Sequence, residues 1–328
     1  MNTSQDFPPG TNTLIDTVLE SEVPELINGE TGVANNSGVE IWYESMLTVE
    51  KPKATIVLSM GAFSGALAWP KYFYEPLLEA GYRVIRYDHR GLGMSDWISD
   101  WQIETAYTLE DMASDVIAIL DRLNIDKAHI VGFSLGGMVG QSLAINYPQR
   151  ILSLASISSS AFLDDPALPD SSISLQINML KLQLKYGLFP SEENTTDMIV
   201  GINYLFKGDG ADEIDVVGIS QSVLYELRDR QGFNPAVWQQ HNTAISKSGS
   251  RYNGLRNITA PTVVIHGSSD PVISIAHAKK YVDLIPGARV LWIKGMGHEL
   301  PKSAMADISA AILTNIERAS KASTVKTQ

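Results

Sequence analysis

One short segment combines the residue types that nucleophilic catalysis requires. The sequence GFSLG, residues 132–136, stands where an apolar run expected as a strand gives way to a helix-like stretch. A turn of this kind holds its central serine in a strained backbone conformation and lifts the hydroxyl above the sheet, while the glycines leave room for neighbouring backbone. The positive end of the following helix and its free N–H groups can stabilise an oxyanion. We therefore predict that Ser134 is a nucleophile and that the Leu135 N–H is an oxyanion donor.

A serine nucleophile needs an imidazole to accept its proton, and the chain contains six histidines. His298 is the best placed of them, because it lies in a glycine-rich loop just after the last expected strand, 290–293. Such a loop can bring an imidazole back over the edge of the sheet. His266 also ends an expected strand and is the main alternative. The remaining histidines are expected in a strand, on helices or in a loop-holding role.

The carboxylate that orients the imidazole is expected at Asp270, in the turn after the apolar run TVVI. This turn shares the carboxyl edge of the sheet with the predicted nucleophile and base, and ligand sites of open α/β sheets gather at that edge. Asp164 and Asp165, which follow the preceding strand, are the alternative acids. A simple turn residue before Pro271 is the other interpretation of Asp270.

Short apolar runs alternate with helix-like stretches along most of the chain, which is typical of parallel strands covered by helices on both faces. The runs expected as strands are 55–59, 83–87, 128–133, 151–158, 262–265 and 290–293. An earlier strand is expected at 38–43 after an Asn-Asn-Ser-Gly turn. The helix expected over 108–123 places its apolar residues on one face. The sequence therefore predicts an α/β fold with a mostly parallel central sheet flanked by helices.

The alternation stops between the strand at 151–158 and the strand at 262–265, where three helix-like stretches follow one another. These stretches are 175–186, 195–206 and 219–227. We expect a core of residues 31–160 and 251–328, a helical cap of residues 161–250 inserted between core strands, and an N-terminal extension of residues 1–30. The cap carries candidates for pocket lining, although packing within the cap is the favoured interpretation of each one: Met179, Tyr186, Phe189, Tyr204, Phe206, Phe233 and Trp238. No strongly amphipathic lid helix stands out.

Composition narrows the classes of function that the 328-residue chain can have. Lys plus Arg number 25 and Asp plus Glu 37, and no long basic run occurs, which disfavours nucleic-acid binding. The absence of cysteine excludes disulfides, thiolate metal sites and a cysteine nucleophile. No histidine and carboxylate cluster has metal-ligand spacing, so we expect no metal and no organic cofactor. Apolar runs are too short to span a membrane and the N-terminus lacks a signal pattern, so we expect a soluble, cytoplasmic protein.

Together these segments resemble the α/β-hydrolase superfamily of serine hydrolases, whose members carry serine, acid and histidine in this chain order. Residues 88–95, DHRGLGMS, resemble the family's D-x-R-G-x-G-x-S loop, and residues 59–62, SMGA, resemble its His-Gly-x oxyanion loop. Met60 stands where many members have histidine. The subgroup similar to aclacinomycin methylesterase shares the Met-Gly loop, the YDHR segment and the GMGH-x-LP segment at 295–301. The resemblance covers about residues 38–160 and 251–315.

The resemblance implies an oxyanion hole formed by the N–H groups of Ala62 and Leu135. It also implies that Asp88 and Arg90 form a buried pair that pins the loop after the fourth strand. Residues expected near the substrate are Met60, Phe63, Trp69 and Trp238.

The predicted activity is hydrolysis of small to medium carboxylic esters through an acyl-enzyme, with a small-molecule ester as substrate and no nucleic-acid partner. The same residues could act on another bond, as in a lactonase, an amidase, a carbon–carbon hydrolase or a perhydrolase. A ligand sensor on the same fold is the alternative outside catalysis. A dinucleotide-dependent oxidoreductase is disfavoured, because the first strand is not followed by the required glycine pattern.

Overall fold

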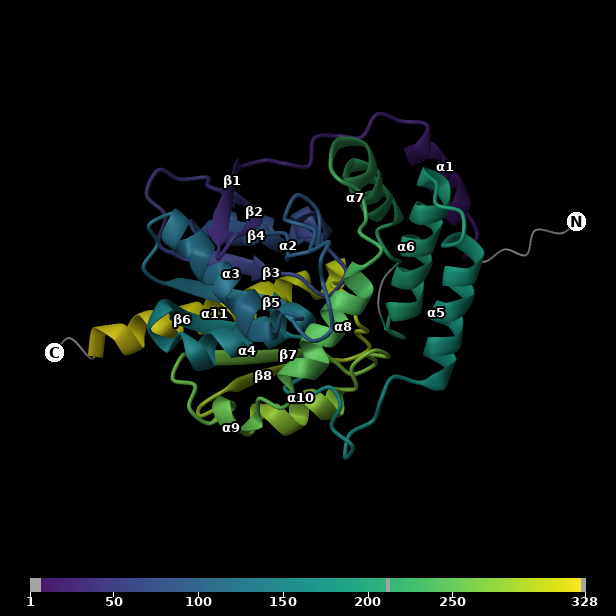
Figure 1. Cartoon of the computed structure of the whole chain (residues 1–328). Helices are drawn as coiled ribbons and strands as arrows, with labels where there is room; N and C mark the ends of the chain where they lie inside the picture. Colours follow the sequence, from purple (N-terminus) through teal and green to yellow (C-terminus); the bar gives the residue numbers. More distant parts are fainter. Residues whose placement is uncertain (1–6, 211–212, 326–328) are drawn as a thin grey trace, which may run out of the picture.

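The computed structural model describes residues 7–210 and 213–325 and is built around one eight-stranded sheet (Figure 1). The strands are β1 (Glu30–Asn36), β2 (Val39–Met46), β3 (Thr55–Ser59), β4 (Arg83–Tyr87), β5 (Ala128–Phe133), β6 (Ile151–Ile157), β7 (Thr262–Gly267) and β8 (Arg289–Ile293). Their order across the sheet is β1-β2-β4-β3-β5-β6-β7-β8. Strand β2 pairs antiparallel with β1 and β4, and every other pair is parallel. The predicted α/β fold with a mostly parallel sheet is confirmed.

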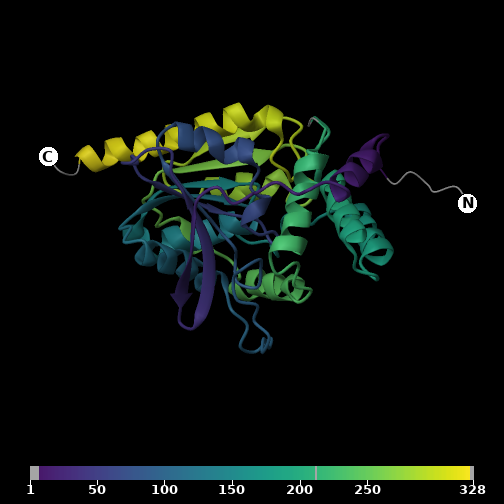
Figure 2. The ribbon, with the colours of Figure 1, turned by 90° about the horizontal axis from the view of Figure 1, so that it is seen from above.

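Helices cover both faces of this sheet and bury an apolar core on each (Figures 1 and 2). One face is covered by α2 (Lys71–Glu79) and α11 (Met305–Val325). The other face is covered by α3 (Leu109–Arg122), α4 (Leu135–Asn146) and α10 (Ile275–Val282). Short helices complete the core: η1 (Ala66–Ala68), η2 (Pro148–Arg150), α9 (Tyr252–Leu255) and η3 (Lys302–Ala304). The loops that follow the parallel strands meet at the carboxyl edge of the sheet.

Four of the helices between β6 and β7 stand beside the core (Figure 1). They are α5 (Ile173–Tyr186), α6 (Glu192–Phe206), α7 (Val216–Asp229) and α8 (Val237–Ser248). The first three match helix-like stretches whose bounds the sequence predicts, whereas the helix-like stretch expected around His241, which is α8, had no predicted bounds. A further helix, α1 (Thr11–Leu19), packs against α6 and α7 and buries Ile15 among their apolar side chains. The N-terminal segment thus contributes to the helical layer rather than to the sheet.

Helix α5 carries apolar residues on two opposite faces. Leu175 and Tyr186 are buried on its inner face. The outer face exposes a row of large apolar side chains at helical spacing: Ile173, Ile177, Leu180 and Leu184. Since the two apolar faces oppose each other, the sequence shows no single apolar side, which is why no amphipathic helix stood out there.

Candidate active site

Ser134 lies in the turn between β5 and α4, where the sequence predicts it. Its backbone has φ 53° and ψ −116°, a region that non-glycine residues rarely adopt. The Ser134 N–H donates to the carbonyl of Ile157 at 2.9 Å, and its own carbonyl accepts from the Ser159 hydroxyl at 2.7 Å and the Gly137 N–H at 3.0 Å. A conformation of this kind costs about 1–3 kcal/mol and persists only where surrounding structure holds it. Neighbouring β6 and its following loop do so here.

The glycines around Ser134 allow β5, β3 and α4 to approach closely, and Gly136 gives the sharpest test. We expect Gly136→Ala to lower the free energy of unfolding by about 3 kcal/mol or more, because the added Cβ would overlap the backbone carbonyl of Ser59. Gly140→Ala, on the same helix, would first meet the flexible Cδ1 of Leu154 at 2.7 Å, so a change below about 1 kcal/mol is expected. Urea denaturation of both variants checks this, and equal losses would contradict it.

His298 lies in the loop after β8 and hydrogen bonds to Ser134. Its Nε2 is 3.0 Å from the Ser134 hydroxyl, and its Nδ1 is 2.8 Å from Oδ2 of Asp270. The backbone N–H of His298 donates to the carbonyl of Phe206, at the end of α6, at 2.8 Å. The ring is flanked by Phe133 and Phe206, with ring centroids 5.0 and 5.6 Å away. A neutral imidazole in this position accepts from the serine and donates to the carboxylate.

Asp270 is buried in the turn after β7 and is held by donors on both carboxylate oxygens. Oδ1 accepts from the N–H groups of Val272 and Ile273 at 2.9 and 2.8 Å. Oδ2 lies 2.8 Å from His298 Nδ1 and 3.3 Å from His266 Nε2. Burial alone would raise the pKa of this carboxyl, but the interactions with His298 and His266 outweigh it and hold the pKa below its usual range. The carboxylate is therefore ionised next to the imidazole.

The alternative base, His266, and the alternative acids, Asp164 and Asp165, make other contacts. The His266 ring stands behind Asp270, where its Nε2 is 2.8 Å from the carbonyl of Ile273. Asp165 is bonded at 2.5 Å to both the Tyr252 hydroxyl and Lys280 Nζ, and Asp164 is exposed on the surface. The structure brings Ser134, His298 and Asp270 together. Asp165 bonds to other residues, and His266 contacts the Asp270 carboxylate at 3.3 Å rather than the Ser134 hydroxyl.

The loop of residues 60–63 follows β3 and lies against Ser134. A Cβ built on Gly61 would be 3.4 Å from the Ser134 Cβ, so the loop backbone passes next to the serine side chain. Neither the Ala62 N–H nor the Leu135 N–H donates a recorded hydrogen bond to any residue within 7–210 and 213–325. Leu135 is also the first residue of α4, where N–H groups have no partner within the helix. Both donors predicted for an oxyanion are thus close to the serine and unused.

Two histidines that the sequence did not connect with the site hold this loop. The Met60 carbonyl accepts from His89 Nε2 at 3.0 Å, and the Phe63 N–H donates to Nδ1 of His241 at 3.3 Å. The sequence predicted a loop-holding role for His89 but placed His241 only on a helix-like stretch. No sequence pattern could connect His241 with this loop, because His241 belongs to α8 and is 178 residues from Phe63.

The four residues predicted near the substrate differ in exposure. Trp69 is 1% exposed, and its ring centroid lies 4.5 Å from that of Phe73 in the core cluster beneath α2. Met60 is buried as well. Phe63 is half-buried against Trp238, with ring centroids 4.2 Å apart, and Trp238 is 54% exposed. Only Phe63 and Trp238 therefore keep aromatic surface available.

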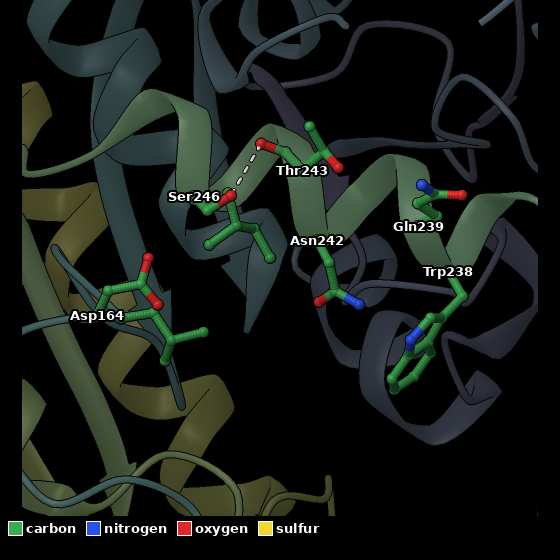
Figure 3. Close-up of a pocket in the computed structure, with 8 residues that line it drawn as sticks. Asp164, Trp238, Gln239, Asn242, Thr243 and Ser246 are labelled. Atoms are coloured by element: carbon green, nitrogen blue, oxygen red, sulfur yellow. Dashed lines mark hydrogen bonds between the residues drawn. The ribbon is translucent and has the colours of Figure 1, made fainter. Parts of the chain in front are cut away.

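A cavity of about 390 Å³ lies beside Trp238 (Figure 3). Residues of α8 form one wall, and Leu163 and Asp164 from the loop after β6 form the other. The α8 residues that line it are Trp238, Gln239, Asn242, Thr243, Ile245 and Ser246. Its lining is mixed, with one aromatic ring, two aliphatic side chains, a carboxylate and several amide and hydroxyl groups.

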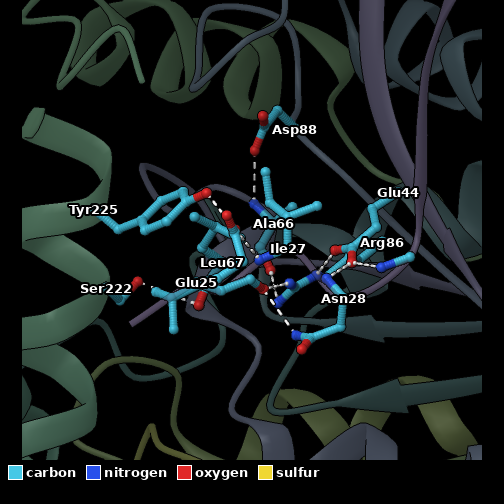
Figure 4. Close-up of polar contacts among 12 residues, drawn as sticks. Glu25, Ile27, Asn28, Glu44, Ala66, Leu67, Arg86, Asp88, Ser222 and Tyr225 are labelled. Atoms are coloured by element: carbon cyan, nitrogen blue, oxygen red, sulfur yellow. Dashed lines mark hydrogen bonds and ion pairs between the residues drawn. The ribbon is translucent and has the colours of Figure 1, made fainter. Parts of the chain in front are cut away.

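Buried polar contacts attach α7 and the N-terminal segment to the core (Figure 4). Asp88 accepts from the Ala66 N–H at 2.7 Å and forms a buried ion pair with Arg230, just after α7. The expected pairing of Asp88 with Arg90 is therefore wrong, because Arg90 pairs with Asp115 on α3 at 2.5 Å instead. The sequence does not reveal these partners, because Arg230 is 142 residues from Asp88 and Asp115 is 25 residues from Arg90.

The same cluster contains a carboxyl group with an unusual environment. Burial, together with the charge of Asp88, raises the pKa of Glu226 to about 7, against the opposing effect of Arg230. Nearby, Tyr225 donates to Glu25, and Ser222 donates to the Leu67 carbonyl at 3.2 Å (Figure 4). Helix α7 is thus fixed to η1 and to the N-terminal segment along its length.

Within the described residues, no group of three or more histidine, cysteine or carboxylate side chains is arranged to hold a metal ion. The helices of residues 7–210 and 213–325 also include none with the length and apolar character needed to cross a membrane.

Comparison with known proteins agrees with this geometry. The family model of the alpha/beta hydrolase fold matches residues 54–302. Rhodomycin D methylesterase DauP of Streptomyces sp. (strain C5) is 30% identical over 304 residues, which cover 88% of this chain and 99% of that protein. The 3-oxoadipate enol-lactonase 1 of Acinetobacter baylyi is 30% identical over 219 residues, covering 65% of this chain and 72% of its own length.

A solved structure shares the architecture. The crystal structure of a hydrolase from Pseudomonas aeruginosa PA01 is similar with a TM-score of 0.64 and 25% identity, covering 88% of this chain and 98% of that one. The family model spans most of the chain, and the methylesterase relative matches 88% of it. The chain therefore belongs to the α/β-hydrolase family of enzymes.

Proposed function

We propose that this protein hydrolyses carboxylic esters through an acyl-enzyme formed on Ser134. The observation that carries the proposal is the continuous chain of hydrogen bonds from the Ser134 hydroxyl through His298 to the buried carboxylate of Asp270. Nucleophile, base and orienting acid in these positions are the constellation of acyl-transfer catalysis. The unused N–H groups of Ala62 and Leu135 supply the complementary oxyanion site.

In the first half of the reaction the Ser134 oxygen attacks the ester carbonyl carbon while His298 Nε2 takes the hydroxyl proton. The carbonyl oxygen becomes an oxyanion, which the N–H groups of Ala62 and Leu135 stabilise. Collapse of this tetrahedral species breaks the bond to the alkoxy oxygen, and His298 returns the proton to the leaving alcohol. Asp270 remains ionised and stabilises the imidazolium.

In the second half a water molecule gives its proton to His298 Nε2 and attacks the acyl carbon. The new oxyanion uses the same two N–H groups. Collapse breaks the bond to Ser134, which takes the proton back from the imidazolium and leaves a carboxylic acid. No group other than these residues and water is needed to balance either half.

Relatives named methylesterases support an ester as the bond cleaved, since they match nearly the whole chain. A lactone is the second candidate, because a relative named an enol-lactonase is 30% identical over a shorter part. The proposed substrates are esters of small to medium size. Amide, carbon–carbon and perhydrolysis chemistry remain outcomes of the test.

We propose that residues 161–250 act as a cap over this site, with the core formed by 31–160 and 251–328 and the N-terminal extension by 1–30. Two contacts support this role. The end of α6 touches the imidazole, through Phe206 and His298, and α8 touches the oxyanion loop, through Trp238 and Phe63. A helical layer with these contacts can shape the pocket and exclude water around it.

A substrate panel tests the proposal. Initial rates are measured with p-nitrophenyl esters of increasing acyl length, with lactones and with anilides, and the protein is labelled with a fluorophosphonate probe. We expect labelling at Ser134 and the highest kcat/KM on an ester. Labelling without turnover of any ester would contradict the choice of bond, and the absence of labelling would favour a ligand sensor.

A further inference from the structure

The oxyanion loop is fixed at both ends by buried histidines from different parts of the fold. His89, in the loop after β4, donates from Nε2 to the Met60 carbonyl at 3.0 Å. His241, on the inserted helix α8, accepts the Phe63 N–H at Nδ1 at 3.3 Å. The two rings meet edge to face with centroids 5.8 Å apart. These contacts bracket the Ala62 N–H, which lies between the two anchored residues in the chain.

Both nitrogens of His241 are used, and the partners fix which one carries the proton. Nδ1 faces an N–H group and must accept, so Nε2 carries hydrogen and donates to the Arg90 carbonyl at 3.2 Å. The side chain is fully buried, and burial, reinforced by the neighbouring His89, lowers the pKa of His241 to about 3. His241 is therefore a neutral imidazole with one assigned tautomer.

Phe63 needs such an anchor, because its backbone has φ 65°. An aromatic residue rarely adopts this left-handed conformation unless surrounding contacts enforce it. Helix α8 supplies two such contacts from positions three residues apart on one face: the Trp238 ring covers the Phe63 ring, and His241 holds its N–H. The conformation of the loop next to Ser134 thus depends on a helix outside the sheet domain.

We propose that His241 is a positioning residue for the oxyanion hole, through which the inserted helix α8 holds the Ala62 N–H in place. The inference rests on the proposed ester hydrolysis by Ser134. It also explains how the loop is held when Met60 replaces the histidine that many relatives carry at that position. Without the acceptor at Nδ1, the Phe63 N–H is left unpaired in a buried place and the loop is free to relax away from the serine.

The test compares His241→Phe with His241→Asn. Phenylalanine keeps a planar ring but has no acceptor, whereas the Asn carbonyl can take the place of Nδ1. We expect His241→Phe to lower kcat about 10- to 100-fold with KM changed less than about threefold, below the full loss of an oxyanion donor. His241→Asn should recover most of this loss.

A merely structural role would not affect oxyanion binding selectively. A trifluoromethyl ketone forms a tetrahedral adduct with the serine and places an oxyanion in the hole, so its inhibition constant reports the hole directly. We expect this constant to rise about 10- to 100-fold in His241→Phe, in parallel with the loss of kcat, and to return toward the wild-type value in His241→Asn. An unchanged constant alongside a lowered kcat would overturn the inference.

Controls separate folding, activity and positioning. His129→Phe changes another buried histidine, which pairs with Ser153 inside the sheet, and should leave kcat and inhibitor binding unchanged. If His241→Phe fails to fold, the smaller His241→Leu takes its place. Ser134→Ala separates the proposed ester hydrolysis from the proposed role of His241. If Ser134→Ala is inactive while His241→Phe and His241→Leu both keep wild-type kcat, the positioning role is wrong and ester hydrolysis stands.

Discussion

Replacing Ser134 with alanine is expected to lower kcat on a p-nitrophenyl ester by about four to six orders of magnitude. The variant keeps the Ala62 and Leu135 N–H groups and the His298–Asp270 pair but has no oxygen to attack the carbonyl. Alanine removes one atom and none of the backbone bonds that hold the turn, so folding should be retained. Steady-state kinetics with purified protein measure the loss, and circular dichroism and thermal unfolding verify the fold.

Ser142→Ala is the matched control for this substitution. Ser142 is buried on the same helix α4 but lies away from the turn, and its hydroxyl has no hydrogen-bond partner among the described residues. We expect wild-type kcat and unchanged fluorophosphonate labelling in this control, while labelling disappears in Ser134→Ala. Turnover by Ser134→Ala within tenfold of wild type would exclude the acyl-enzyme mechanism.

Replacing Asp270 with asparagine is expected to lower kcat by about three to four orders of magnitude with little change in KM. The carboxylate accepts from His298 Nδ1 and so keeps the proton off Nε2, which must accept from Ser134. An amide nitrogen turned toward Nδ1 would favour the opposite tautomer, and the imidazolium would lose its counter-charge. Kinetics on the same ester, with fluorophosphonate labelling rates, provide the measurement.

The pKa of Asp270 is lowered in the folded protein, which fixes the sign of its effect on stability. The unfolded state then binds the proton more readily, so the carboxylate stabilises the fold above its ordinary pKa of about 4. That contribution is lost only as the pH falls through the lower, folded value. Within the neutral range the carboxylate therefore stays ionised and keeps its stabilising effect.

Asp165→Asn is the control that separates the two candidate acids. Asp165 binds Tyr252 and Lys280 rather than the imidazole of His298, so we expect kcat within about threefold of wild type. Any effect should be on thermal unfolding, through the loss of the Lys280 ion pair. A large loss of kcat in Asp165→Asn with a small loss in Asp270→Asn would reverse the proposed assignment of the acid.

Local sequence was sufficient for much of the fold and for the nucleophile. The alternation of apolar runs and helices follows from burial of parallel strands on both faces, and it predicts the sheet without any long-range information. The segment at 132–136 is equally local, because a strand, a tight turn and a helix are adjacent in the chain. Steric exclusion around Gly136 makes this arrangement specific to glycine.

The tertiary structure alone decided which groups meet. His298 and His266 both follow strands, and Asp270 and Asp165 both follow strands, but only hydrogen-bond geometry separates the pair beside Ser134 from the alternatives. The same holds for Asp88, whose partner is Arg230, 142 residues away. The resemblance implied the nearby Arg90 as the partner, whereas packing of α7 on the core brought the distant Arg230.

Trp69 and His241 also show that distance along the chain does not determine which residues meet in the fold. Trp69 lies close in sequence to the oxyanion loop, yet its side chain is buried in the core and packs on Phe73. His241 is far away in sequence, yet helix α8 brings it to the Phe63 N–H. The sequence by itself determined the sheet, the strained serine turn and the types of residue needed for chemistry, because these depend on neighbours in the chain. Which side chains lie beside the serine and hold the loop of residues 60–63 depends on contacts between residues 28 to 178 apart in the chain, and only the folded chain decides them.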